Sequence, residues 1–110
     1  MRINECKTLK DKQDFAMEYH GIECQQRKLV EEVHELNEAI TKYETRKAEK
    51  LCVDYREIVT ELADVRNLLE QIQYKYLIDS IELQQEKRYK IERHFKEMEK
   101  EINENRNSRE

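Results

Sequence analysis

Two stretches of the chain carry residues at a spacing that matches one face of an α-helix. In each stretch, five positions follow one another at i, i+3, i+7, i+10 and i+14. The first stripe consists of Leu29, Glu32, Leu36, Ala39 and Tyr43, and the second consists of Ile58, Glu61, Val65, Leu68 and Ile72. This spacing places the side chains on the side of a helix that packs against its neighbours. The sequence therefore predicts two long helices that bury these stripes.

The second position of each stripe is a glutamate, although packing alone favours Leu or Ile there. Glu32 is followed three residues later by Glu35, and Glu61 is followed by Asp64, so each helix presents two carboxylates on one side. Four anions on apolar seams are costly to bury, but a bound hard cation offsets that cost. Oxygen ligands favour Mg²⁺ or Mn²⁺ over zinc. We therefore predict a divalent-metal site at these four acids, with Mg²⁺ as the first choice.

Residues that make turns are almost missing, with 1 Gly and 0 Pro in 110 residues. Because sheets depend on such residues, we expect an all-α fold, with helices over about 4–19, 23–46 and 51–76 and from about Ser80 onward. Gly21 is the expected end of the first helix. A short connection is expected within 43–49, and the polar tail 103–110 is expected to fray.

The hydrophobic fraction of 37% is thin for a lone chain of this length. We therefore expect a single domain over residues 1–110, an antiparallel bundle of about four helices completed by association of identical chains. A homodimer and a homotetramer are equally compatible with the sequence.

Charge and cysteine content argue against a nucleic-acid-binding, membrane or disulfide-rich protein. The net charge of -4 comes from 21 basic and 25 acidic residues, a balance that favours neither nucleic-acid nor membrane binding. No apolar run approaches the ~20 residues that span a bilayer, and the first residues lack the apolar core of a signal peptide. Cys6, Cys24 and Cys52 show no paired spacing, so we expect reduced thiols in a cytoplasmic protein.

The acid pairs have two other interpretations. With 25 acidic residues in the chain, E-x-x-E and E-x-x-D arise readily on solvated helix faces, but apolar neighbours such as Val65 are not typical of such a face. A di-iron carboxylate bundle uses Glu-x-x-His on two helices. Glu31 and His34 supply one such pair, yet neither His20 nor His94 has a glutamate three residues before it.

Residues 25–40 and 61–65 resemble the MazG-type all-α nucleoside triphosphate pyrophosphohydrolases, especially the short phage-borne and bacterial members. The family signature is E-E-x-x-E, a variable spacer and E-x-x-D, each followed by aliphatic residues. Here Glu31 to Glu35 and Glu61 to Asp64 match it, with 25 residues between Glu35 and Glu61. The resemblance covers about residues 22–95 and is specific only at the acid pairs and their aliphatic neighbours.

The resemblance implies Mg²⁺-dependent hydrolysis of a nucleoside triphosphate to the monophosphate and pyrophosphate, in a bacterium or a phage-infected one. Glu32, Glu35, Glu61 and Asp64 would bind Mg²⁺. Glu31 would be an accessory acid that orients water or binds a second ion, and Glu31 or Glu35 would act as the base. The resemblance leaves open whether one ion or two take part.

The resemblance also places basic residues near the substrate phosphates, and the matching positions here are Lys87, Lys90 and Arg93. Lys42 is a weaker candidate of the same kind. Relatives often stack the base on an aromatic residue early in the second helix, which this chain lacks. The sequence thus leaves the base and sugar preference open, with Tyr43, Tyr55 and Phe15 as candidates.

Two functions of other classes remain open from the sequence. The chain could be a catalytically silent helical bundle that acts as an interaction or regulatory module, in which Glu32 and Glu61 would tolerate replacement by Gln. A metal-free coiled-coil oligomer would need heptads sustained through the last helix, and Gln84, Lys87 and Lys90 interrupt them.

Overall fold

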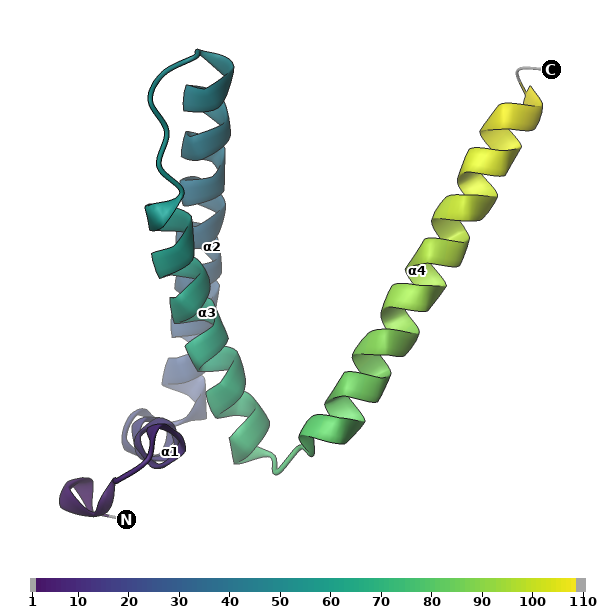
Figure 1. The fold of residues 1–110 in the computed structure, drawn as a ribbon. Coiled ribbons are helices and arrows are strands. Elements are labelled where there is room, and N and C mark those ends of the chain that lie inside the picture. Colours follow the sequence, from purple (N-terminus) through teal and green to yellow (C-terminus); the bar gives the residue numbers. More distant parts are fainter. Residues whose placement is uncertain (1, 109–110) are drawn as a thin grey trace. The chain divides into compact units, whose positions relative to one another are not determined.

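This computed structural model describes residues 2–108 of the chain. They form four α-helices and a short 3₁₀ turn, joined by connections (Figure 1). In chain order they are η1 (Ile3–Glu5), α1 (Leu9–His20), α2 (Ile22–Ala48), α3 (Arg56–Lys75) and α4 (Ser80–Ser108). Residues 2–108 contain no β-strand, which confirms the all-α prediction. The chain divides into two compact units: the first unit, Met1–Leu77, holds α1 to α3, and the second unit, Ile78–Glu110, holds α4.

The first helix begins later than the sequence suggested, because a capping box fixes its start. The Thr8 hydroxyl accepts a hydrogen bond from the backbone N–H of Asp11 at 3.0 Å, and the Asp11 carboxylate accepts one from Thr8 N–H at 3.2 Å. At the other end, the N–H of Gly21 donates to the Met17 carbonyl at 2.8 Å. Gly21 has φ +83°, a conformation that favours glycine, which confirms its predicted role as the end of α1.

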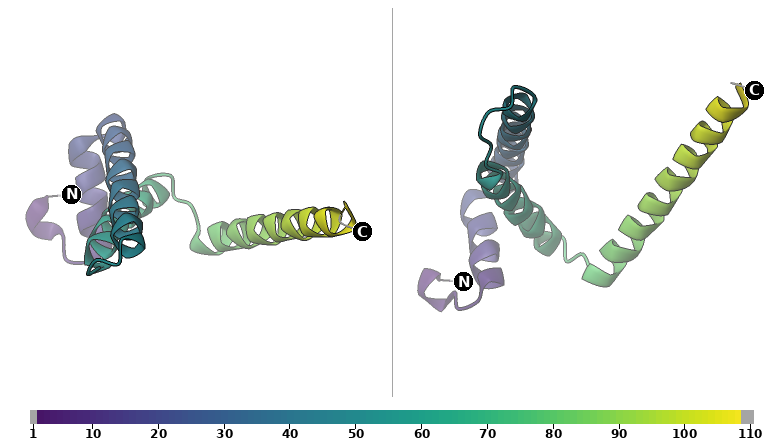
Figure 2. Two further views of the ribbon diagram at one scale, coloured as in Figure 1. Left: turned by 90° about the horizontal axis from the view of Figure 1, so that it is seen from above. Right: turned by 45° about the horizontal axis from the view of Figure 1, so that its top comes forward.

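In the first unit, α2 and α3 lie side by side, and α1 packs against both of them near the start of α2 and the end of α3 (Figures 1 and 2). The small core consists of four buried apolar residues from these helices: Met17, Ala39, Val65 and Leu68. All ten positions of the two predicted stripes are buried or half-buried. The stripes are therefore the packing faces of α2 and α3, as the spacing predicted.

A polar pair is buried within this core. Gln25 of α2 is 2% exposed and Gln71 of α3 is 3% exposed, and Gln25 Nε2 donates to Gln71 Oε1 at 2.8 Å. Gln71 Nε2 in turn donates to Asn67 Oδ1 at 3.3 Å. Buried amides need such partners because an unpaired one costs free energy. The pair therefore helps to fix the register of α2 against α3.

The connection between α2 and α3 lies at residues 49–55, which corrects the predicted position at 43–49 and the predicted start of the third helix near residue 51. Lys50 has φ 59°, which interrupts the helical backbone after α2. The Asp54 carboxylate then accepts a hydrogen bond from the N–H of Arg56 at 2.9 Å. This local side-chain bond starts α3 at Arg56, in place of an earlier helical turn.

The second unit consists mainly of α4, whose side chains are all exposed. Asp79 Oδ1 accepts a hydrogen bond from the N–H of Ile81 at 2.7 Å, in keeping with the predicted start at Ser80. The helix continues to Ser108, so the prediction that the chain frays beyond Ile102 is wrong for residues 103–108. No Gly or Pro interrupts this stretch, and Arg93–Glu97 at 3.3 Å is one of several i,i+4 ion pairs that support the helix by about 0.2–0.5 kcal/mol each. Residues 109–110 of the predicted tail lie outside the described residues.

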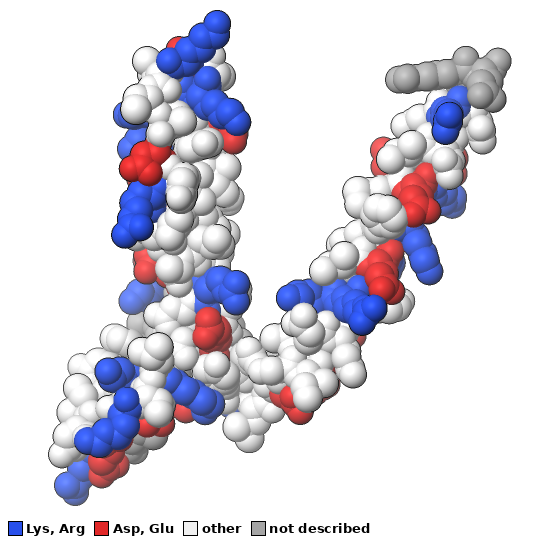
Figure 3. Space-filling view, viewed as in Figure 1, with Lys and Arg blue, Asp and Glu red and all other residues white. Residues whose placement is uncertain are grey.

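Surface charge is mixed rather than segregated. Figure 3 shows Lys and Arg interspersed with Asp and Glu on the visible face of the first unit and along α4. Within residues 2–108, no helix has both the length and the apolar character needed to cross a membrane.

Candidate metal centre

The packing of α2 against α3 brings three of the predicted ligands together. Glu32 of α2 and Glu61 and Asp64 of α3 each offer one carboxylate oxygen, and these three oxygens lie within 4.8 Å of one another. Glu61 and Asp64 share a face because they stand three residues apart on one helix. Glu32 reaches the same point from the facing stripe. The three residues form what we call the acid cluster.

Two oxygens of the acid cluster lack the partners that a buried polar atom requires. Glu32 and Glu61 are half-buried, and neither Glu32 Oε2 nor Glu61 Oε2 has a hydrogen-bond partner among residues 2–108. Burial raises the pKa of the Glu32 carboxyl, and the neighbouring charges of Glu35, Asp64 and Glu61 raise it further. Burial likewise raises the pKa of Glu61, followed by the charges of Glu35 and Asp64.

Glu35, the fourth predicted ligand, lies beside the acid cluster and not within the group of three. Its side chain is exposed. Its carboxyl is nevertheless close enough to raise the pKa of both Glu32 and Glu61, through its charge and through hydrogen bonding between the carboxyl groups. Glu35 is therefore placed to contact a ligand of the acid cluster from its solvent side.

The acid cluster fits a hard divalent cation. All of its donor atoms are carboxylate oxygens, which are the ligands that Mg²⁺ prefers. The unpartnered oxygens of Glu32 and Glu61 would each gain an interaction from a cation, and its positive charge would oppose the repulsion that raises their pKa values. Mg²⁺ commonly keeps several waters and binds through a few carboxylates plus substrate phosphates.

Two neighbouring residues stand apart from the acid cluster. Glu31 precedes Glu32 and is exposed, and it is not one of the three grouped acids. His34 Nε2 lies 2.8 Å from Glu38 Oε1, and both side chains are exposed. The structure therefore gives no support to a Glu31–His34 metal pair of the di-iron kind.

The predicted phosphate-binding residues all belong to α4, in the second unit. Lys90 lies 4.0 Å from Glu86 and Arg93 lies 3.3 Å from Glu97, so both pair with acids of their own helix. Lys87 is exposed on the same helix. Their contact with a substrate stays a prediction.

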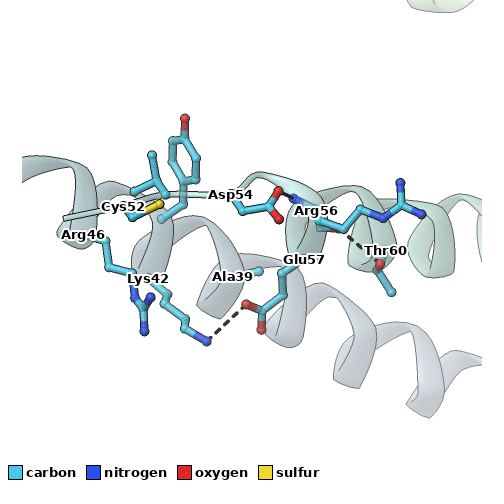
Figure 4. Close-up of a pocket in the computed structure, with 10 residues that line it drawn as sticks. Ala39, Lys42, Arg46, Cys52, Asp54, Arg56, Glu57 and Thr60 are labelled. Carbon is cyan, nitrogen blue, oxygen red and sulfur yellow. Dashed lines mark hydrogen bonds and ion pairs between the residues drawn. The ribbon is translucent and has the colours of Figure 1, made fainter. Parts of the chain in front are cut away.

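Two pockets of the first unit bear on the site, and of these only the smaller is lined by residues of the acid cluster, Glu32 and Asp64. The smaller, of about 180 Å³, is lined from α1, α2 and α3 by mostly polar residues: Ala16, His20, Gln25, Lys28, Glu32, Asp64, Asn67, Leu68 and Gln71. The larger, of about 430 Å³, lies around the α2–α3 connection, and Figure 4 shows its lining. Of the aromatic residues considered for base stacking, Tyr43 lines this larger pocket. Tyr55 and Phe15 line neither of the two.

Arg46 and Arg56 line the larger pocket together with Lys42. Lys42 is one of the candidates predicted from the sequence, and neither arginine is. Arg46 follows Lys42 by four residues and so shares its face of α2, but no helical spacing relates Arg56 to either residue.

Known proteins offer no direct guide to this arrangement: comparisons with models of protein families, with curated proteins and with solved structures each find no match for the chain.

Proposed function

We propose that the chain is a Mg²⁺-dependent nucleoside triphosphate pyrophosphohydrolase of the MazG-like type, which converts a (deoxy)nucleoside triphosphate to the monophosphate and pyrophosphate. One observation carries the proposal. The E-E-x-x-E and E-x-x-D patterns, 25 residues apart in sequence, supply three carboxylates to one point, and two of these have unpartnered oxygens. Two half-buried anions, Glu32 and Glu61, beside the exposed Asp64 are unfavourable without a cation, so a metal-dependent role accounts for the cluster.

The neighbouring acids suit the chemistry of phosphoanhydride hydrolysis. Mg²⁺ bound at the acid cluster would neutralise phosphate charge and lower the pKa of water. Glu35, exposed beside the cluster, is the candidate general base that accepts the proton of the attacking water, with Glu31 as an accessory acid that orients it. Attack on phosphorus forms one P–O bond and breaks the bond to the pyrophosphate leaving group. Mn²⁺, another cation with oxygen ligands, is expected to substitute.

The proposed partner besides the nucleotide is a second copy of the chain, in a homodimer or a homotetramer. Along α4, Ile91, Phe95, Met98 and Ile102 follow at intervals of four, three and four residues and are 59%, 56%, 51% and 63% exposed. An apolar helix face gains stability when another apolar surface covers it. A nucleotide substrate and three cysteines that form no disulfide both fit the cytoplasm of a bacterium, or of one infected by phage.

The exposed face of α4 also favours a second candidate function, a catalytically silent helical module that binds other chains. The two functions differ in what they require of the acid cluster. A hydrolase needs Glu61 as a carboxylate at the metal site, whereas a silent module gains from its neutralisation, because burial raises its pKa.

A pyrophosphate-release assay tests the proposal. The full chain is incubated with Mg²⁺ and each canonical nucleoside triphosphate and deoxynucleoside triphosphate, and pyrophosphate is measured. We expect release from at least one nucleotide, loss of at least a hundredfold in kcat/KM for Glu61→Gln, and little change for Glu44→Gln. Glu44 is a matched control because it is exposed on α2 and lies outside the acid cluster.

The outcomes separate the two functions. Release of pyrophosphate from none of the nucleotides, by a chain with intact helical circular dichroism, would favour the silent module. Full activity in Glu61→Gln would remove the acid cluster from the mechanism even if the chain is a hydrolase.

A further inference from the structure

We propose that the larger pocket, at the end of α2 and the start of α3, binds the phosphate chain of the nucleotide through Arg46 and Arg56, next to the ion-paired Lys42. We call it the basic pocket. Its preference for an anion is argued from its lining, whereas the identity of that anion as a nucleotide phosphate chain rests on the proposed function.

Two of the three cations that line the basic pocket, Arg46 and Arg56, are not engaged in ion pairs with any described residue and are available to bind an anion. Lys42 Nζ pairs with Glu57 Oε2 at 3.3 Å, and Asp54 Oδ1 accepts the backbone N–H of Arg56 at 2.9 Å. Neither the Arg46 nor the Arg56 guanidinium has an ion-pair partner within residues 2–108. Figure 4 shows Lys42 and Glu57 directed toward each other, with the two arginines on either side of the pair. Arginine suits phosphate because its planar fork offers two parallel hydrogen bonds.

The start of α3 adds backbone donors to these cations. The helix begins at Arg56 and runs for 20 residues, so its N-terminus carries a positive partial charge. Val59 N–H donates to the Tyr55 carbonyl, but the backbone N–H groups of Glu57 and Ile58 have no acceptor among the described residues. Free N–H groups at a helix start bind phosphate well. The cations and the helix start therefore favour the same kind of ligand.

The basic pocket and the acid cluster lie along the same α2–α3 groove. Ala39, a lining residue, follows Glu32 by seven positions on α2, and Glu57 precedes Glu61 by four on α3. At about 1.5 Å of rise per residue, these offsets are roughly 10 Å on α2 and roughly 6 Å on α3. Figure 4 shows the Arg56 side chain extending toward Thr60, the residue that precedes Glu61. A phosphate chain held at the acid cluster would therefore span between one and two helical turns to reach the basic pocket.

Inorganic pyrophosphate is the probe that tests the basic pocket without relying on catalysis. It is titrated into the isotope-labelled full chain in the absence of Mg²⁺, and backbone amide shifts are followed by NMR. We expect the shifts to concentrate at residues 42–46 and 52–58. Arg46→Ala and Arg56→Ala should each weaken binding by about tenfold, the effect of losing one charge-assisted hydrogen bond. Arg66→Ala is the matched control, since Arg66 is exposed on α3 and lies outside the pocket lining.

Each alternative outcome bears on a different claim. Any of three results would overturn the proposed role of the basic pocket: no binding of pyrophosphate, amide shifts centred on α4, or equal weakening of binding by Arg66→Ala and Arg56→Ala. So would an active hydrolase whose KM for nucleotide is unchanged in both arginine variants, although the proposed function would stand. Pyrophosphate bound in the pocket of a chain that hydrolyses no nucleotide would support the anion site and contradict the hydrolase.

Discussion

The stability of the chain should depend on Mg²⁺ through the acid cluster. Because the three carboxylate oxygens lie within 4.8 Å of one another, they form one site, and single-site linkage applies. At a Mg²⁺ concentration one hundred times its Kd, binding adds about 2.7 kcal/mol to the free energy of unfolding. For a unit the size of residues 1–77, that corresponds to a rise of about 10–20 °C in the unfolding midpoint. Glu61→Gln should lose most of this rise.

Without metal, Glu61→Gln should be more stable than the natural chain, which is the reverse of the order expected in Mg²⁺. The pKa values of Glu32 and Glu61 are raised above 4.5 by burial and by neighbouring acids, so the folded chain holds protons that the unfolded chain has already released. The free energy of unfolding therefore falls as the pH rises through the interval between 4.5 and the raised values. Glutamine does not ionise. In chelator at pH 7, Glu61→Gln should accordingly unfold at a higher temperature than the natural chain, and the difference should shrink below pH 4.5.

Thermal unfolding followed by circular dichroism checks both statements, in buffers with chelator and with Mg²⁺, at pH 4 and pH 7. Glu44→Gln serves as the control and should follow the natural chain in every condition. The reasoning is refuted if Mg²⁺ leaves the midpoint of the natural chain unchanged, or if it raises that of Glu61→Gln equally.

Three further changes probe the packing and the surface of the two units. Gln71→Leu leaves the buried Gln25 amide without its 2.8 Å partner and should lower the free energy of unfolding in urea by about 1–3 kcal/mol. Adding Gln25→Leu should restore much of that loss, and no recovery would contradict the pairing. Thr8→Ala should cost about 1 kcal/mol in the same assay by removing the cap of α1. Hydrogen bonds from Thr8 and Lys7 lower the pKa of Asp11, so its stabilising effect should disappear as the pH falls below 3.8 in a urea titration. Phe95→Asp should leave the helical signal intact and reduce the oligomeric state in sedimentation, and an unchanged state would argue against association through α4.

Helical periodicity predicted the fold well because it is a local property. The spacing of Leu29, Ala39, Val65 and Leu68 depends only on 3.6 residues per turn, and each of these positions is buried or half-buried. Element ends depend on particular hydrogen bonds and single φ angles. The positive φ of Lys50 ends the helical backbone there, and α3 starts at Arg56 and not near residue 51. Hydrophobic spacing alone does not predict this boundary.

The acid cluster was predictable for a related reason. An acid three residues after another acid shares its face of the helix, so one correct register between α2 and α3 brings Glu32, Glu61 and Asp64 together. Glu35 was harder to place, since its distance from the group depends on how the two helices are rotated about their axes. Sequence spacing specifies which face a residue occupies, but not how far its carboxylate reaches across the interface.

The basic pocket was out of reach of the same reasoning because the α2–α3 connection creates it. Arg46 and Arg56 are ten residues apart in sequence, and only the path of residues 49–55 turns both toward one cavity. A connection can change this path without disturbing the buried stripes, since it contributes no buried residue. Under the proposed function, we therefore expect substrate preference to vary more freely at this connection than at the acid cluster, where each acid also occupies or adjoins a packing face.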